Sequence, residues 1–118
     1  MFVNEKDKSE MKKIIIKTTT LDELIKEKYE HIAWVKIDVE GAELEVLKGS
    51  STILSKTKNI IIEVHEHILN QNNKNSKEII EILEESGFKI TLLNDFWDEK
   101  NSPNQILKSD YILGQKQF

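Results

Sequence analysis

Acidic and imidazole side chains stand where two apolar stretches of the sequence end. Asp38 and Glu40 follow the first stretch, and Glu63 and His65 close the second. Such groups accept hydrogen bonds from hydroxyls, and an imidazole with a pKa near neutrality can act as a general base. We therefore predict Asp38, Glu40 and His65 as catalytic residues. The alternative for Asp38 is a turn carboxylate that caps the next helix.

Three more residues are candidates for substrate binding, each with a structural alternative. Glu43 falls with Glu40 in the first turn of the following helix, where the helix dipole favours carboxylates whatever the function. Glu63 binds substrate only if its side chain points into the cleft, and it could pair with Lys36 across the strands instead. Trp97 could cover an apolar substrate surface, or it could anchor the long loop that contains it.

Two histidines at alternate positions suggest a metal site. His65 and His67 would share a face if the strand continued past His65. A metal for hydrolysis could also be held by Asp38, Glu63 and His65, since three ligands in one cleft suffice. We rank metal-dependent hydrolysis last and expect no metal.

The composition describes one small domain with a single hydrophobic core. The chain has 118 residues, 38% hydrophobic and 32% charged, with 17 Lys+Arg against 21 Asp+Glu and a net charge of −4 at pH 7. Without cysteine there is no thiol nucleophile, thiolate zinc site or disulfide. An acidic chain without arginine is disfavoured as a nucleic-acid binder. The apolar runs are too short for a membrane span, and the cytoplasm is the expected compartment.

Alternating strand and helix patterns predict an α/β fold in residues 12–118, after a flexible N-terminus at 1–11. β-branched and apolar runs predict five strands, at 12–19, 32–38, 59–65, 88–93 and 109–116. Apolar residues three and four apart predict helices at 21–29, from 40 to 54 with a break at Gly49, and from a cap at Ser76 to Gly87. The polar tracts 70–75 and 94–105 are predicted loops. Crossovers of the β-α-β type build a parallel sheet, and the closing strand, with no helix before it, is predicted antiparallel.

Three blocks of the sequence, in this order, resemble the FkbM-type methyltransferases. They are TTLD at 19–22, VKIDVEGAELEVLKG at 35–49 and IIEVH at 61–65. The resemblance runs from about Ile14 to the end of the chain. It implies an S-adenosylmethionine-dependent enzyme that transfers methyl groups to hydroxyls of sugars or polyketide-like small molecules.

The same resemblance implies the C-terminal half of a Rossmann-like class I methyltransferase fold, mostly parallel with an antiparallel last strand. The fourth to seventh of its seven strands would be 32–38, 59–65, 88–93 and 109–116. Asp38 and Glu40 would lie at the active-site edge of the fourth strand, with Asp38 also binding the cofactor. Glu63 and His65 would lie on the fifth strand.

The cofactor loop is where this chain departs from the family. Members carry a glycine-rich loop in an N-terminal half, and the four widely spaced glycines of this chain form no such loop. We therefore expect a donor site that is at most half built and a chain that is inactive alone. Its partners would be a hydroxyl acceptor and either a complementary N-terminal half or a second copy in a homodimer. The alternative is a non-catalytic dimerising or protein-interaction module, because the strand at 32–38 would expose an edge.

Overall fold

The computed structural model describes residues 11–25, 27–93 and 110–117. The predicted flexible N-terminus, apart from Met11, lies outside these residues, as do the predicted loop at 94–105 and its Trp97. Those predictions therefore remain untested. Within the described residues, no helix combines the length and apolar character that crossing a bilayer requires.

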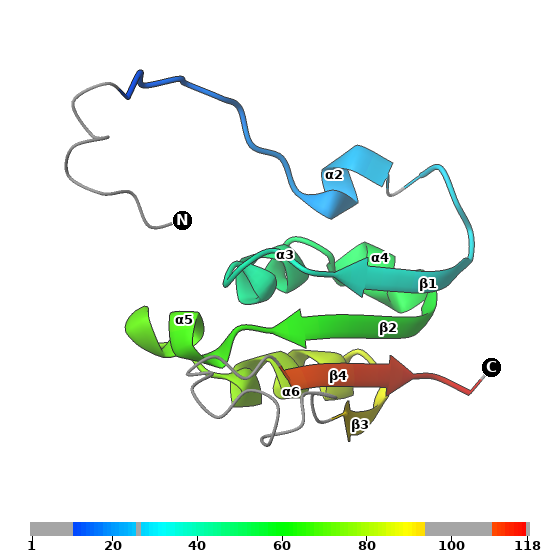
Figure 1. The fold of residues 1–118 in the computed structure, drawn as a ribbon. Helices are drawn as coiled ribbons and strands as arrows, with labels where there is room; N and C mark the ends of the chain where they lie inside the picture. Colours follow the sequence, from blue (N-terminus) through cyan, green and yellow to red (C-terminus); the bar gives the residue numbers. More distant parts are fainter. Residues whose placement is uncertain (1–10, 26, 94–109, 118) are drawn as a thin grey trace, which may run out of the picture.

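Strands and helices alternate along most of the described chain (Figure 1). In order they are α2 (Leu21–Ile25), β1 (Ile32–Ile37), α3 (Glu43–Lys48), α4 (Ser51–Lys56), β2 (Thr57–Val64), α5 (Glu66–Gln71), α6 (Ser76–Glu85), β3 (Lys89–Leu93) and β4 (Asp110–Gln115). The separate helices α3 and α4 confirm the predicted break at Gly49. Four predicted strands are present, whereas α2 is shorter than the helix predicted at 21–29.

The four strands form one mixed sheet in the order β1-β2-β4-β3. β1 and β2 are parallel, and β4 lies antiparallel between β2 and β3. The closing strand is therefore antiparallel, as predicted, and the other three strands point the same way. One row across the sheet places Val35 opposite Ile60 and Ile60 opposite Gly114. A Cβ on Gly114 would lie 2.8 Å from Cγ2 of Ile60, so glycine makes room for this side chain.

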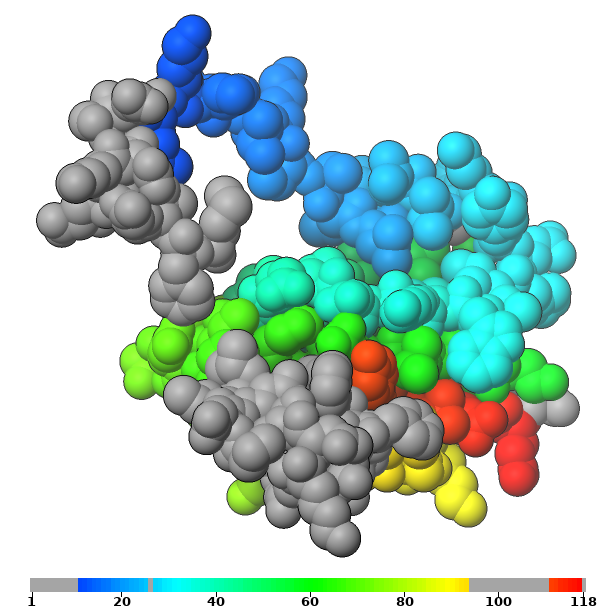
Figure 2. Space-filling model, viewed as in Figure 1, coloured from blue at the N-terminus to red at the C-terminus, as the bar shows by residue number. Residues whose placement is uncertain are grey.

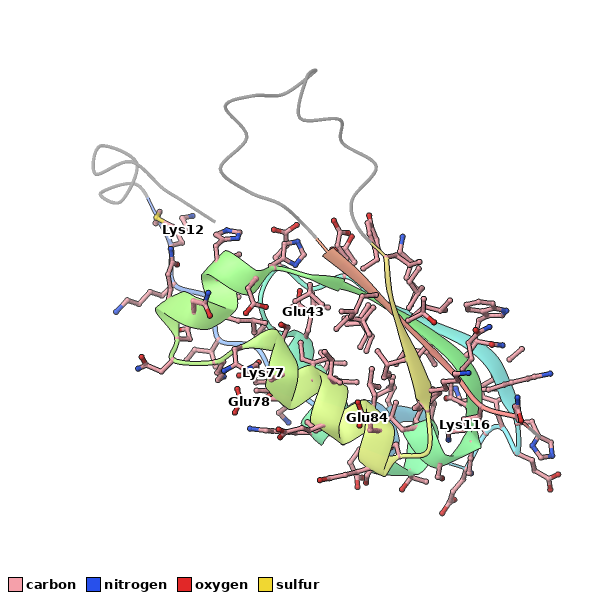
Figure 3. The ribbon with its side chains drawn as sticks, turned by 90° about the horizontal axis from the view of Figure 1, so that it is seen from below. Lys12, Glu43, Lys77, Glu78, Glu84 and Lys116 are labelled. Carbon is pink, nitrogen blue, oxygen red and sulfur yellow. The ribbon has the colours of Figure 1, made fainter. Side chains whose placement is uncertain are left out.

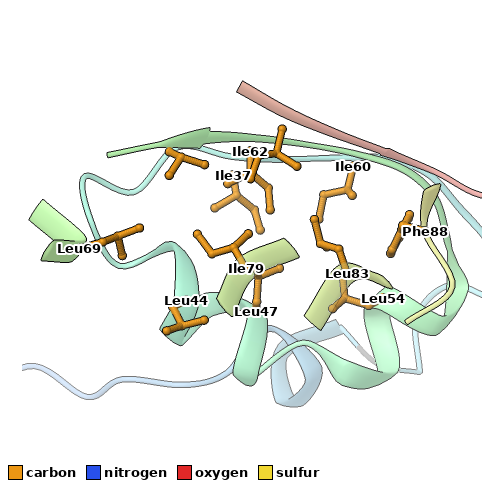
Figure 4. Close-up of a cluster of buried hydrophobic side chains, with 12 residues drawn as sticks. Ile37, Leu44, Leu47, Leu54, Ile60, Ile62, Leu69, Ile79, Leu83 and Phe88 are labelled. Atoms are coloured by element: carbon orange, nitrogen blue, oxygen red, sulfur yellow. The ribbon is translucent and has the colours of Figure 1, made fainter. Parts of the chain in front are cut away.

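The hydrophobic core lies between one face of the sheet and the helices (Figure 4). Alternate residues of a strand share a face, and Ile60, Ile62 and Val64 of β2 are almost completely buried there. The helices contribute a set of buried leucines and isoleucines, namely Leu44, Leu47, Leu54, Leu69, Ile79 and Leu83. Burying one such side chain contributes roughly 1.5–3 kcal/mol. This packing fixes the positions of the carboxyl ends of β1 and β2.

The strand predicted at 12–19 is wrong. Residues 11–20 form neither helix nor strand, and Ile14, Ile15 and Ile16 are 80%, 98% and 75% exposed. Figure 2 shows this segment extending away from the rest of the described surface. β-branched residues favour a strand where a neighbouring strand and a packed face accept them. No described strand pairs with this segment, so its composition alone does not make it a strand.

The connection between β2 and α6 also differs from the sequence prediction. Helix α5 follows His65 directly, and Leu69 is the buried residue among its six. One buried position gives no helical period that a sequence pattern could show. At α6 the N-cap is Asn75 instead of the predicted Ser76, because Asn75 and Glu78 form a reciprocal capping box.

Candidate functional site

Two parallel strands bring the candidate residues to one edge of the sheet. β1 and β2 are in register, with Ile37 opposite Ile62. Asp38 is the residue after β1, and His65 is the residue after β2. Ligands of open α/β sheets gather outside the carboxyl ends of the strands, which is where both side chains lie.

A left-handed turn connects β1 to α3. Glu40 has a φ of 53° and Gly41 a φ of 101°. A Cβ on Gly41 would lie 2.3 Å from Cγ2 of Ile68 in α5, so the turn needs glycine both for its conformation and for space. The turn thereby places Gly41 against the helix that begins just after His65.

His65 and Glu43 form a buried pair beneath this turn. Nδ1 of His65 lies 2.5 Å from Oε1 of Glu43, and the backbone N–H of Gly41 donates to the same oxygen at 3.1 Å. Glu43 is 0% exposed and His65 is 9% exposed. Figure 3 shows Glu43 between the sheet and the helices. One nitrogen of the imidazole is thus enclosed in the protein.

The other ring nitrogen of His65 faces the acidic residues after β1. Nε2 lies 3.9 Å from Oδ1 of Asp38 and 3.9 Å from Oε1 of Glu40. The side chains of Asp38 and Glu40 are 40% and 81% exposed, so the cluster opens to solvent on this side. The carboxylates of Asp38 and Glu40 are therefore accessible to a small polar ligand, and Nε2 of His65, whose side chain is 11% exposed, lies next to them. These three atoms lie within 4.8 Å of one another, a spacing that would also suit a cation.

The surrounding charges raise the pKa of His65 above its ordinary value. Burial by itself lowers this pKa, but the hydrogen bond with Glu43 and the negative charges of Glu43, Glu40 and Glu63 outweigh it. The carboxylates therefore stabilise the imidazolium. A neutral His65 can take a proton from a bound hydroxyl, and the neighbouring carboxylates stabilise the resulting positive charge.

The structure brings Asp38, Glu40 and His65 together, and it places Glu43 in the interior beside His65. The first turn of α3 directs Glu43 into the interior, where it contacts His65 and is closed to solvent. A direct contact between Glu43 and a substrate therefore has no support. Glu63 is partly buried in β2 and adds its charge to the surroundings of His65, and its substrate contact stays a prediction.

A metal site at His65 and His67 would need both residues to lie on one strand, and this condition is not met. β2 ends at Val64, so the strand does not continue past His65. His67 lies in α5, and residues two apart on a helix do not face the same way.

The sequence does not predict the contact between Glu43 and His65, nor the hydrogen bond that the N–H of Gly41 donates to Glu43. Glu43 stands between Ala42 and Leu44, but exposed Glu45 stands in the same way between Leu44 and Val46, so the sequence offers no signal that separates them. The two partners are 22 residues apart in the chain. Their contact depends on how α3 packs against β2, which no local pattern specifies.

Comparisons with known proteins point to one class of enzyme. The family model described as the methyltransferase FkbM domain matches residues 2–90. The hexuronic acid methyltransferase AglP of Haloferax volcanii is 33% identical over 105 residues, which cover 86% of this chain and 36% of the relative. No solved structure matches the chain.

The mixed α/β fold and these matches define a methyltransferase domain. The chain belongs to the FkbM methyltransferase family. Membership generally implies the use of S-adenosylmethionine as methyl donor. The chain spans 36% of the length of the curated relative that it matches.

Proposed function

We propose that this chain supplies the acceptor side of an O-methyltransferase site that acts on a hydroxyl of a sugar or polyketide-like small molecule. The observation that carries the proposal is the open cluster of Asp38, Glu40 and His65 at the carboxyl edge of two parallel strands, in a chain of the FkbM family. The sheet, with its antiparallel β4, fits the C-terminal half of a Rossmann-like methyltransferase fold.

A carboxylate can accept hydrogen bonds from the hydroxyls and the ammonium group of a methyl donor. S-adenosylmethionine, when bound, supplies a methyl carbon that accepts an electron pair from oxygen while its bond to sulfur breaks, which leaves a neutral thioether. Asp38 is the residue of this chain that we assign to the cofactor, because its carboxylate is 40% exposed and can accept hydrogen bonds.

His65 is the proposed general base. Its Nε2 accepts the proton of the acceptor hydroxyl as the oxygen bonds to the methyl carbon, and it then passes this proton to solvent. Asp38 and Glu40 accept hydrogen bonds from neighbouring hydroxyls and so orient the acceptor. The charge of Glu43 compensates the imidazolium during the step.

The charge of the site limits how an acceptor binds. The similarity to a hexuronic acid methyltransferase supports a sugar acid as the acceptor. A carboxylate beside Asp38 and Glu40 would be repelled by two like charges. We therefore place a hydroxyl of the sugar at His65, with any carboxylate of the acceptor directed away from these two residues.

Titration of the ¹⁵N-labelled chain with methyl glucoside and methyl glucuronide tests the acceptor side without requiring turnover. We expect saturable shifts of the amide signals of Gly41 and His65 at millimolar sugar, with Gly87 unmoved as the internal control. Asp38→Ala should abolish these shifts. Shifts that are absent, or that spread equally to Gly87, would overturn the proposal.

A second candidate function is a dimerising or protein-interaction module, and the open edge of β1 favours it. Among the described strands, β1 pairs with β2 alone. Beside its other edge lies a groove of about 460 Å³ lined largely by apolar side chains of α2 and β1. Trp34 in this lining is 58% exposed. Such an edge and groove would accept a second copy of the chain or a complementary N-terminal half.

Size-exclusion chromatography with light scattering distinguishes this candidate. A homodimer at micromolar concentration that Trp34→Glu dissociates would support it. Leu92→Glu is the matched control, because Leu92 is 63% exposed on β3 at the opposite edge of the sheet. A clean monomer at high micromolar concentration would count against the homodimer.

A further inference from the structure

The proposed reaction uses the charge of Glu43, but it leaves open why its carboxylate is buried against Nδ1 of His65. Among the described residues, Glu43 and His65 are the two ionisable side chains that are buried. One oxygen of Glu43 contacts His65 and Gly41, while the other, Oε2, is buried without a hydrogen-bond partner among the described residues. A buried carboxylate that is only partly satisfied costs stability. A glutamine or an apolar side chain could fill the same volume without a charge.

We propose that Glu43 is a positioning residue, which holds the proton of neutral His65 on Nδ1 and so presents the lone pair of Nε2 to the acceptor hydroxyl. This inference rests on the proposed function for the part that concerns the acceptor. The arrangement of the imidazole itself can be tested without it.

With Glu43 as a carboxylate, the hydrogen-bond geometry favours this tautomer. A carboxylate only accepts hydrogen bonds, so a neutral His65 that contacts Glu43 through Nδ1 must carry its proton on that nitrogen. The Gly41 N–H donates to the same oxygen and fixes its place. The remaining ring nitrogen, Nε2, then has a free lone pair, which is what a general base needs.

The open side of His65 distinguishes this arrangement from an ion pair that only stabilises the fold. A purely structural pair needs no further polar neighbours, whereas here Nε2 of His65, whose side chain is 11% exposed, faces the exposed carboxylates of Asp38 and Glu40. The enclosed end of the ring fixes the tautomer, and the open end meets the ligand. The left-handed turn at Glu40 and Gly41 contributes to both ends of the imidazole ring. The N–H of Gly41 donates to Glu43 at the Nδ1 end, and the side chain of Glu40 lies at the Nε2 end.

Long-range ¹H–¹⁵N NMR of the histidine rings tests the tautomer directly. In the unmodified chain we expect neutral His65 to be protonated on Nδ1, whereas exposed His31 serves as the internal reference for an unconstrained ring. Glu43→Gln should keep the tautomer, since its amide oxygen can still accept from Nδ1. Glu43→Leu removes the acceptor, and the preference for Nδ1 should be lost.

The charge of Glu43 has its own readout in the same spectra. Glu43→Gln should lower the pKa of His65, because it removes the negative charge that raises this pKa most. The charges of Asp38, Glu40 and Glu63 remain around the ring. Neutral His65 protonated on Nε2, or a tautomer unchanged in Glu43→Leu, would overturn the proposal. Amide spectra confirm that each variant is folded, and Glu43→Gln keeps the test valid should Glu43→Leu unfold.

Kinetics separate the failure of this inference from the failure of the proposed function. In the complex with the complementary N-terminal half that completes the donor site, Glu43→Gln should lower kcat by about 100-fold with little change in KM, because it weakens the base without touching the acceptor. An unchanged kcat in a folded Glu43→Leu variant, which lacks the acceptor for Nδ1, would overturn the positioning role. If the tautomer is as expected but no sugar binds, the proposed function fails while the arrangement of Glu43 and His65 stands.

Discussion

His65 presents its two ring nitrogens to different surroundings, and this asymmetry carries the chemistry of the site. Nδ1 meets buried Glu43, and Nε2 meets exposed Asp38 and Glu40. The sequence places these side chains after two strands but gives no information on which of them are enclosed. Burial separates Glu43, which acts on the imidazole, from the two carboxylates that a ligand can reach.

We expect the free energy of unfolding to decrease as the pH rises through the pKa of folded His65. That pKa lies above the unfolded value of about 6.5, so the folded state binds the proton more tightly. The resulting stabilisation is complete below about pH 6.5 and is lost above the folded pKa. Urea unfolding across this range should show the step in the unmodified chain and lose it in His65→Gln. A step of the same size in both proteins would contradict the assignment.

At the scale of elements, the turn between β1 and α3 determines where the acidic cluster lies. Gly41 is in the left-handed region and directly against Ile68 of α5. Helix α5 is therefore part of the support of the site, although the sequence pattern does not predict this helix. The sequence does place a turn between Asp38 and Gly41, because the period of the apolar residues changes there.

A matched pair of glycine substitutions separates backbone conformation from space. Both Gly41 and Gly87 have positive φ, 101° and 95°, but the nearest atom to a Cβ on Gly87 is Cε of Lys116 at 3.8 Å. Gly87→Ala should cost about 1–2 kcal/mol through its backbone conformation. Gly41→Ala should cost about 3 kcal/mol, since the contact with Ile68 adds to the same strain. Equal losses in thermal or urea unfolding would show that the packing of Gly41 against α5 is wrong.

At the scale of the whole molecule, the described residues form one sheet with the helices packed against one of its faces. The strands at 32–38, 59–65, 88–93 and 109–116 could be predicted because each supplies apolar residues to that core. Segment 12–19 has a similar composition but no packed face, and only the tertiary structure shows this. In the same way the contact between Glu43 and His65 spans 22 residues and is visible only in the folded chain.

Two identical substitutions test this description of the core. Ile62 in β2 is 0% exposed and Ile15 is 98% exposed. Ile62→Ala should destabilise the protein by about 2–5 kcal/mol, because it leaves a cavity in the core. Ile15→Ala should change the free energy of unfolding by less than about 0.5 kcal/mol. A large loss from Ile15→Ala would show that segment 12–19 packs as the strand that its composition suggests.

The donor-binding role proposed for Asp38 is tested most directly by isothermal titration of the purified chain with S-adenosylhomocysteine. We expect saturable heat, lost in Asp38→Ala and retained in Glu84→Ala, whose carboxylate is exposed on α6. This result would show that the carboxyl end of β1, where Asp38 lies, recognises a donor-like ligand. No heat at millimolar ligand would contradict a donor-binding role for Asp38, and it would favour the interaction module.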